Sequence, residues 1–271
     1  MDPAIGWTAV DTASDLAAIV RTLRAAGCVF AEDEAALLVA AAGTPEALAA
    51  MVARRVDGFP LEHILGWVEF CGLRVEVDPD VFVPRRRTEL LARRAAALAA
   101  RAREVTVVDL ACGCGAVGLA VARLARDVTL YAVDIQPAAV ACARRNLRPV
   151  GGSVHEGDLF DPLPVDLRGR VDVLVANVPY VPSDAVDTMP PEARVHEPRV
   201  ALDGGTDGLD VLRRVAGTAR DWLAPGGYVL MEVGEDQIGT ALAALAAGGL
   251  DPAVDRDDDL AATIVTGHSP Q

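Results

Sequence analysis

The sequence predicts an α/β protein, in which helices flank a mostly parallel sheet and a small helical domain comes first. Roughly the first 58 residues are rich in Ala and Leu at helical spacing. From about residue 85, short apolar runs alternate with helical stretches, which favours a parallel sheet. A glycine-rich turn joins the first such run to the helix after it. We therefore expect an N-terminal helical domain at residues 1–67, a β-hairpin linker at 68–84 and the main domain at 85–271.

The N-terminal part carries clear helix signals. Residues 14–26 and 32–42 have helical spacing, and a glycine follows each stretch. Thr44 and Pro45 then form the pattern of an N-cap followed by Pro at the first helical position. Residues 70–83 alternate in polarity around Asp78, Pro79 and Asp80, and this predicts a hairpin.

Composition and charge limit the classes of function that are possible. The chain has 271 residues, of which 52% are hydrophobic, so it can bury a full core. Its net charge of -14 argues against non-specific binding of nucleic acid, which needs a positive surface. Arginine clusters such as Arg85-Arg86-Arg87 are interpreted as solvated helix faces. A local basic patch is the less favoured alternative. No apolar run is long and clean enough to span a bilayer, so no membrane partner is expected.

Cysteine and histidine usage points to a cytoplasmic protein without a metal. The five cysteines include no C-x-x-C pair, which is typical of a reducing cytoplasm without structural zinc. The four histidines show no metal-binding spacing. Residues 1–7 lack the basic-then-apolar layout of a signal peptide.

A strand–turn–helix unit at residues 105–122 has the composition of a nucleotide-binding loop. Gly113, Gly115 and Gly118 form a G-x-G-x-x-G pattern after a β-branched run. Small residues let the backbone approach a ligand, and the helix N-terminus offers free N–H groups. Asp134 ends the next apolar run about twenty residues downstream, a place suited to binding a ribose diol. The expected cofactor residues of this unit are Asp109, Ala111, Cys112, Gly113, Cys114, Gly115, Asp134 and Ile135.

Three details favour S-adenosylmethionine over a nicotinamide dinucleotide as the cofactor. Asp109 lies inside the first strand, where it can hold the loop or the cofactor's amino group. Asp158 and Leu159 follow a third short strand, where an acid can meet the adenine amino group and Leu159 can pack on the ring. An Asn-x-Pro-Tyr element follows the fourth strand. Since the carboxyl ends of neighbouring strands share one crevice, all of these elements are expected to line one site.

The tetrapeptide Asn177-Val178-Pro179-Tyr180 is suited to holding a planar NH2 group, and we assign it as both catalytic and substrate-binding. The Asn177 side-chain oxygen accepts one N–H, and the Val178 carbonyl accepts the other. Pro179 biases residue 178 toward an extended conformation, and Tyr180 offers a stacking face. Asn177 also counts among the cofactor-binding residues. An ordinary strand end with a Pro turn remains the alternative on the tetrapeptide alone.

Beyond these motifs, the chain resembles the protein N5-glutamine methyltransferases that modify peptide-chain release factors. The matching segments are residues 55–70, Val81 to Arg85 with Thr88 and Glu89, residues 196–209, and residues 232–234 with Gln237. The resemblance implies a Rossmann-like class I S-adenosylmethionine-dependent methyltransferase fold, whose seven-stranded, mostly parallel sheet has an antiparallel last strand. It also implies a protein substrate, with the glutamine of a Gly-Gly-Gln loop as methyl acceptor and S-adenosyl-L-homocysteine as product.

The resemblance further implies that His196, Glu197, Pro198 and Arg85 bind the substrate peptide. A purely structural loop clamp is the alternative for the segment from His196 to Pro198. Because the chain carries no basic groove in its charge pattern, no stable nucleic-acid partner is expected.

The chain departs from the family pattern at several positions. Val178 stands where the family usually has Pro, which leaves φ less restricted. Arg86 and Arg87 replace the Pro and the first acid of the family's Pro-Arg-Pro-Glu-Thr-Glu segment, and cysteines at 112 and 114 replace Thr or Ser. Two alternatives therefore stay open: an amino-directed adenine methyltransferase of nucleic acids, and a non-catalytic binder of a translation factor.

Overall fold

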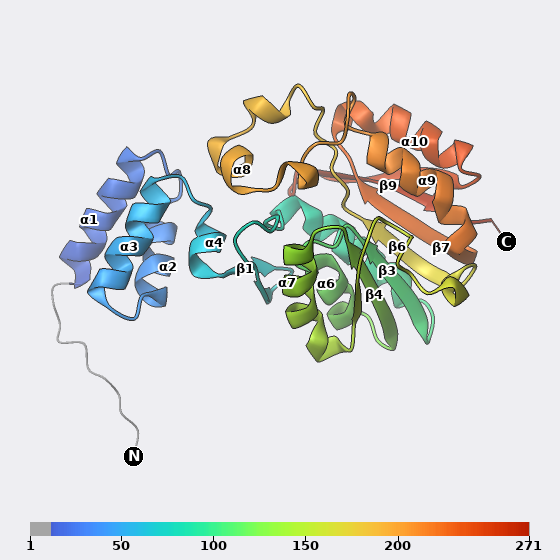
Figure 1. The fold of residues 1–271 in the computed structure, drawn as a ribbon, viewed down its shortest axis with the longest axis horizontal. Coiled ribbons are helices and arrows are strands. Elements are labelled where there is room, and N and C mark those ends of the chain that lie inside the picture. The colour runs from blue at the N-terminus through green and yellow to red at the C-terminus, as the bar shows by residue number, and fades with distance from the viewer. Residues whose placement is uncertain (1–11, 271) are drawn as a thin grey trace, which may run out of the picture. The chain divides into compact units, whose positions relative to one another are not determined.

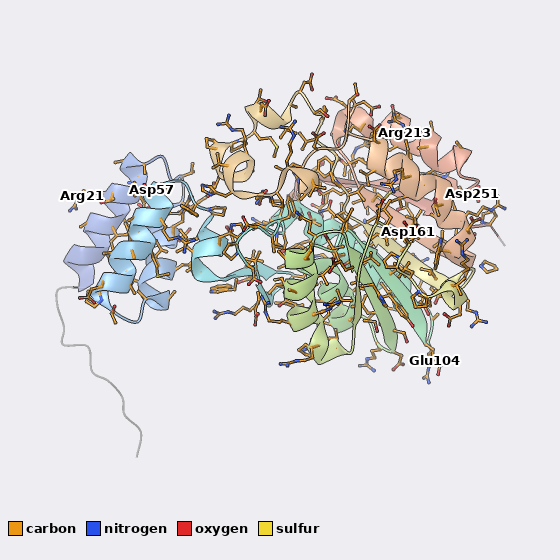
Figure 2. The ribbon with its side chains drawn as sticks, in the orientation of Figure 1. Arg21, Asp57, Glu104, Asp161, Arg213 and Asp251 are labelled. Carbon is orange, nitrogen blue, oxygen red and sulfur yellow. The ribbon has the colours of Figure 1, made fainter. Side chains whose placement is uncertain are left out.

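The computed structural model describes residues 12–270, which form two compact units divided after Leu65. The interpretation of residues 1–7 as lacking a signal peptide lies outside the described residues. No helix within the described range is long and apolar enough to cross a membrane. Charged side chains such as Asp161, Arg213 and Asp251 point away from the ribbon (Figure 2).

The N-terminal unit is a helical bundle with its own small core. Its helices are α1 (Thr12–Ala25), α2 (Ala31–Ala41), α3 (Pro45–Val56) and α4 (Leu61–Leu65). The Thr44 hydroxyl accepts the Ala47 N–H at 3.1 Å, so Thr44 caps α3 as its sequence predicts. Leu23 and Leu38 are fully buried in the core of this unit.

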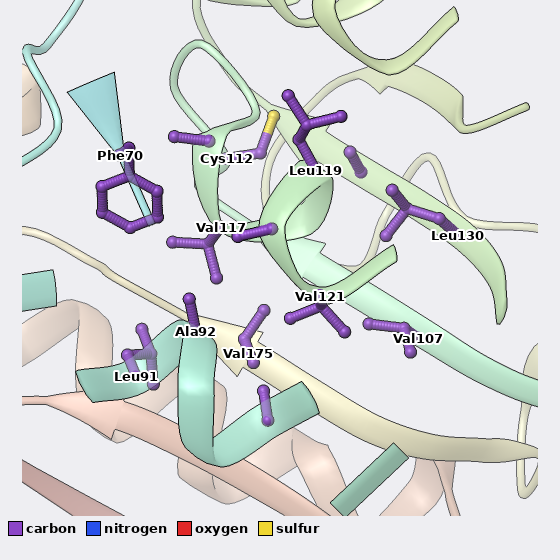
Figure 3. Close-up of a cluster of buried hydrophobic side chains, with 14 of the residues drawn as sticks. Phe70, Leu91, Ala92, Val107, Cys112, Val117, Leu119, Val121, Leu130 and Val175 are labelled. Carbon is purple, nitrogen blue, oxygen red and sulfur yellow. The ribbon is translucent and has the colours of Figure 1, made fainter. Parts of the chain in front are cut away.

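A short hairpin begins the second unit, and it lies earlier than the sequence pattern suggested. Strands β1 (Trp67–Phe70) and β2 (Leu73–Glu76) pair antiparallel around Cys71 and Gly72. Both turn residues have positive φ, 51° and 73°, as a tight two-residue hairpin turn requires. Gly72 suits this conformation, but Cys71 rarely adopts it, so the pair is a weaker turn signal than Asp78 and Pro79. Phe70 is buried in the same cluster as Val117 (Figure 3).

Seven strands form the sheet of the second unit in the order β5-β4-β3-β6-β7-β9-β8. Their bounds are β3 (Val105–Leu110), β4 (Val128–Asp134), β5 (Ser153–Glu156), β6 (Val171–Ala176), β7 (Leu223–Glu232), β8 (Asp251–Asp257) and β9 (Ala262–His268). The first five strands pair in parallel, whereas β9 is antiparallel to β7 and β8. This is the seven-stranded, mostly parallel sheet with an antiparallel last strand that the resemblance implied.

Helices cover both faces of this sheet (Figure 1). One face packs on α5 (Glu89–Ala99), α6 (Ala116–Leu124) and α7 (Pro137–Leu147); the other packs on α9 (Asp210–Trp222) and α10 (Ile238–Ala247). Side chains alternate between the faces along each strand, so Val107 joins the first core and Val108 the second. The helix α8 (Pro191–His196) lies in the long segment between β6 and α9.

Candidate active site

A pocket opens at the carboxyl ends of β3, β4, β5 and β6, the edge at which open α/β sheets bind ligands. The space that it encloses, counted out to the open mouth, is about 1070 Å³. The lining includes most of the cofactor residues that the sequence predicts: Asp109, Ala111, Cys112, Gly113, Cys114, Asp134, Ile135, Asp158, Leu159 and Asn177. Residues from four separate strand ends therefore meet in one cavity.

The glycine loop turns sharply from β3 into α6. Gly113 and Gly115 have φ values of 56° and 81°, and Gly115 is the N-cap of α6. Ala111 adopts φ 52°, a conformation that costs a residue with a side chain about 1–2 kcal/mol. The Gly118 N–H donates to Asp109 Oδ2 at 2.8 Å, and a Cβ at position 118 would lie 3.0 Å from that oxygen. The loop thus needs the small residues that its sequence supplies.

Asp134 fixes the glycine loop to the end of β4. Its Oδ2 accepts the Gly113 N–H at 2.8 Å, and its Oδ1 accepts the Gln136 N–H at 2.9 Å. The side chain is largely buried, and burial raises the pKa of this carboxyl above its ordinary value. A carboxylate has about four lone-pair sites, so each oxygen can still accept a hydroxyl from a ligand such as a ribose.

Asp109 makes the stability of the ligand-free protein depend on pH. Burial raises the pKa of this carboxyl to about 7, opposed by the Gly118 N–H and reinforced by the charge of Asp134. The unfolded value is about 3.9, so between these pH values the folded state binds more protons. The free energy of unfolding should therefore fall as pH rises from about 4 to about 7, by up to about 1.4 kcal/mol per pH unit.

Urea unfolding at pH 5, 6, 7 and 8 measures this slope. Asp109→Asn should flatten most of it, because Asn does not titrate and its side-chain oxygen still accepts the Gly118 N–H. The part that remains should have the same sign, since the pKa of Asp134 is also raised. Equal slopes in the wild type and in Asp109→Asn would show that Asp109 is not the titrating group.

Asp158 and Leu159 reach the pocket after β5, but Asp158 has a partner already. Its carboxylate pairs with Arg214 of α9 at 2.6 Å, and both residues line the cavity. Leu159 adopts φ 49° and presents its side chain to the same cavity. The pair brings a cation as well as an acid to this end of the pocket.

Two residues that line the pocket each carry a buried side-chain oxygen with no hydrogen-bond partner among residues 12–270: Asn177 Oδ1, after β6, and Thr88 Oγ1, directly before α5. Pro179 also lines the cavity, whereas Val178 points its side chain into the core. Within residues 12–270, no hydrogen bond ends on the Val178 carbonyl. Since buried polar atoms are normally satisfied, both side-chain oxygens are candidates for hydrogen bonds to a ligand.

Tyr180 lies outside the pocket lining. Its hydroxyl donates to Glu232 Oε1 at 2.7 Å, and its backbone carbonyl accepts the Gln237 side-chain N–H at 2.8 Å. Burial and the charge of Glu232 raise the pKa of the Tyr180 hydroxyl well above its ordinary value. In this structure the residue anchors the loop that follows β6.

The segment from His196 to Pro198 and Arg85 are likewise not part of the pocket lining. Glu197 is buried, and its carboxylate accepts the Val83 N–H at 3.2 Å and pairs with Arg85 at 2.5 Å. These contacts fasten the segment before α5 to the end of α8. They agree with the loop clamp that the sequence left open, and the binding of a substrate peptide by these residues stays a prediction.

Several lining residues had no assigned role from the sequence. Phe82, Pro84 and Thr88 come from the segment after the hairpin, and Val200, Ala201, Val211 and Arg214 come from the segment after β6 and from α9. Their local sequence carries no ligand signal, because only the fold brings them to the cavity. The family match at Val81–Arg85 and Thr88 was the one hint for the first three.

Comparison with known proteins gives related sequences and a related fold. The model of the methyltransferase small domain family matches residues 86–207. The release factor glutamine methyltransferase of Geobacter sulfurreducens is 41% identical over 203 residues, which cover 73% of this chain and 70% of the relative. A 4-amino-L-phenylalanine/4-methylamino-L-phenylalanine methyltransferase of Streptomyces pristinaespiralis is 38% identical over 203 residues, covering 73% and 69%.

Among solved structures, the T. thermophilus 16S rRNA N2 G1207 methyltransferase in complex with AdoMet and guanosine superposes with a TM-score of 0.54. The match covers 75% of this chain and 49% of that chain, at 19% identity. At this identity the likeness concerns the fold, which is that of the class I methyltransferases.

Proposed function

We propose a reaction and a substrate for this chain from the premise that it belongs to the release factor glutamine methyltransferase family. It is an S-adenosylmethionine-dependent enzyme that methylates the side-chain amide nitrogen of a glutamine in a protein. The protein substrate is a peptide-chain release factor, which presents the glutamine in an exposed Gly-Gly-Gln loop. One observation supports this most directly: Asn177 lines the same pocket as the glycine loop, and its buried Oδ1 has no hydrogen-bond partner among the described residues.

The residues present fit the cofactor. The glycine loop offers backbone close to the cavity, Asp134 can accept ribose hydroxyls, and Leu159 and Ile135 offer apolar surface beside them. When bound, S-adenosylmethionine supplies an electrophilic methyl group. Asp158 can accept an N–H from a ligand while it remains paired with Arg214, because its carboxylate has lone pairs left.

The acceptor nitrogen needs positioning more than activation. An amide nitrogen is a poor nucleophile, since its lone pair is delocalised into the carbonyl. Asn177 Oδ1 and the Val178 carbonyl accept the two amide hydrogens, which orients the nitrogen and favours the positive charge that develops there. No general base is required, because an amide protonated on nitrogen is very acidic.

Thr88→Val separates a ligand role for the Thr88 hydroxyl from a structural one. Valine has nearly the same shape but no polar atom, and the hydroxyl is buried without a partner. We expect affinity for S-adenosylmethionine to fall about fivefold to tenfold, the loss of one hydrogen bond of about 1 kcal/mol. The ligand-free protein should become slightly more stable, because an unsatisfied polar group is removed.

Isothermal titration with S-adenosylmethionine and thermal unfolding without it measure these two effects. Thr188→Val is the matched control, since Thr188 lies in an exposed turn where its hydroxyl donates to the Ala185 carbonyl. Unchanged cofactor affinity in Thr88→Val would place the hydroxyl outside the ligand contacts.

Mass spectrometry tests the reaction itself. Intact release factors and a Gly-Gly-Gln loop peptide are incubated with the enzyme and S-adenosylmethionine, and fragmentation locates any added methyl. A gain of one methyl on the glutamine side-chain amide supports the proposal. Measurable cofactor affinity without any glutamine methylation would overturn the proposed substrate.

A second candidate acceptor is the aromatic amine of a small molecule. The 38% identity to a methyltransferase of 4-amino-L-phenylalanine favours it, because an aryl NH2 is also planar and offers two hydrogens. Adding 4-amino-L-phenylalanine and adenine-containing oligonucleotides to the same assay discriminates among the acceptor classes. The negative net charge argues against the oligonucleotides.

A cytoplasmic location is part of the proposal, supported by five cysteines that are all free.

A further inference from the structure

The loop that carries Asn177 is anchored at its far end, at Tyr180, by residues from other strands and loops. The Tyr180 hydroxyl bonds to Glu232 at the end of β7, and the Tyr180 carbonyl accepts an N–H from Gln237. With Val at position 178, the loop has one proline instead of two to restrict its backbone. The geometry of this loop therefore depends more on these hydrogen bonds than it would with prolines at both positions.

Glu232 is a buried acid whose charge must be compensated. Its side chain is 2% exposed, and a single oxygen, Oε1, accepts both the Tyr180 hydroxyl and the Arg87 Nε–H, the latter at 3.1 Å. The other oxygen, Oε2, is buried and has no hydrogen-bond partner among residues 12–270. A buried carboxylate without a cation is strongly unfavourable. Among the described residues, Arg87 is the one cation that forms a salt bridge with Glu232.

Arg87 contacts both Tyr180 and Glu232, the two side chains whose hydrogen bond anchors the loop. It lies in the 3-10 turn η1 (Arg86–Thr88), directly before α5, and its guanidinium carbon is 5.6 Å from the centroid of the Tyr180 ring. The next residue, Thr88, lines the pocket. Arg87 thus connects the start of α5, the end of β7 and the loop after β6.

We propose that Arg87 is a positioning residue for methyl transfer. It compensates the charge of Glu232, so that Glu232 holds the Tyr180 hydroxyl and, through the loop, the acceptor oxygens at positions 177 and 178. Its effect on turnover rests on the proposed function. The family pattern has an acid at this position, so the arginine anchor is a feature of this chain.

If Arg87 and Glu232 formed only a structural salt bridge at the surface, the expected result would differ. Such a pair contributes little to stability, and its loss leaves turnover unchanged at temperatures well below unfolding. Arg93 serves as the matched control, because its half-exposed side chain pairs with Glu89 on α5 at 2.5 Å and does not contact Tyr180 or Glu232.

The kinetic test compares Arg87→Met, Arg87→Lys, Glu232→Gln, the double variant Arg87→Met with Glu232→Gln, and Arg93→Met. We expect Arg87→Met to lower kcat on the glutamine peptide about tenfold, with the Kd for S-adenosylmethionine changed less than twofold. Arg87→Lys should retain more activity. The double variant should recover most of the loss, because a neutral glutamine side chain at position 232 needs no cation and its oxygen still accepts the Tyr180 hydroxyl. Loss in Arg87→Met without recovery in the double variant would overturn the proposal.

A second measurement does not depend on the substrate. The chain has three tyrosines, Tyr131, Tyr180 and Tyr228, so protein labelled with 3-fluorotyrosine gives three fluorine resonances, and Tyr180→Phe identifies one. Arg87→Met should shift and broaden the Tyr180 resonance, and Arg93→Met should not. An unchanged Tyr180 resonance in Arg87→Met overturns the proposed role of Arg87 even if the wild type methylates glutamine. A changed resonance in an enzyme that methylates no glutamine supports the anchor and rejects the proposed function.

Discussion

Asn177→Ala is expected to reduce kcat on a glutamine substrate by about 100-fold or more, the cost of removing one well-placed hydrogen-bonding group from a preorganised site. The change deletes Oδ1, which is buried and has no hydrogen-bond partner in the part of the chain that the structure describes. The Kd for S-adenosylmethionine should change less than about threefold, because the glycine loop and Asp134 remain. Single-turnover methylation and isothermal titration measure the two quantities separately.

Ser183→Ala is the control for Asn177→Ala. Ser183 lies in the same connection after β6, and its hydroxyl donates to Asp203 at 2.6 Å, outside the pocket lining. It should leave kcat within about twofold, as removal of a hydrogen bond away from the reacting atoms changes stability more than chemistry. Equal losses of turnover and of cofactor affinity in Asn177→Ala would instead make Asn177 a cofactor residue.

The sequence predicted where the glycine loop and the acid after the next strand lie, because local rules determine both positions. A glycine loop after a strand, and an acid at the end of the next strand, have fixed places in a parallel sheet. Gly113 and Asp134 are accordingly joined by a hydrogen bond of 2.8 Å. The mostly parallel sheet and its antiparallel last strand also agree with expectation.

Residues that reach the site through long-range packing could not be found this way. Thr88 lines the pocket because α5 packs against the sheet, and nothing in its own neighbourhood predicts a buried hydroxyl without a partner. The Tyr180 hydroxyl bonds to Glu232, 52 residues later, whereas packing of the Tyr180 ring on the substrate amide stays a prediction. Pairing between side chains so distant in sequence leaves no periodic signal.

The hairpin shows a second kind of limit, which concerns turn chemistry. Asp78 and Pro79 are strong turn formers, yet they follow β2, and the chain reverses at Cys71 and Gly72. Backbone pairing between Trp67 and Glu76 fixes this register. Residue preferences only rank the possible turn positions. The packing of Phe70 into the core selects the turn at Cys71 and Gly72.

Asp134→Asn is expected to weaken S-adenosylmethionine binding by about 30-fold or more, roughly 2 kcal/mol. Both carboxylate oxygens accept backbone N–H groups, from Gly113 and from Gln136. An Asn side chain offers one acceptor oxygen and one NH2, so one backbone N–H would face another donor. The glycine loop would lose its tether to β4, and a ribose would lose a charged acceptor, whereas kcat at saturating cofactor should fall much less.

Asp172→Asn separates this effect from the general loss of an aspartate that accepts a backbone N–H. Asp172 lies near the amino end of β6, away from the pocket, and its Oδ2 accepts the Thr106 N–H at 2.8 Å. It offers the same chemistry, an Asp that accepts a backbone N–H, at the opposite edge of the sheet. Its substitution should lower the unfolding temperature and leave cofactor affinity unchanged. If Asp134→Asn and Asp172→Asn lowered stability equally and neither weakened cofactor binding, Asp134 would be a structural residue, and the ribose contact would have to be sought elsewhere in the pocket.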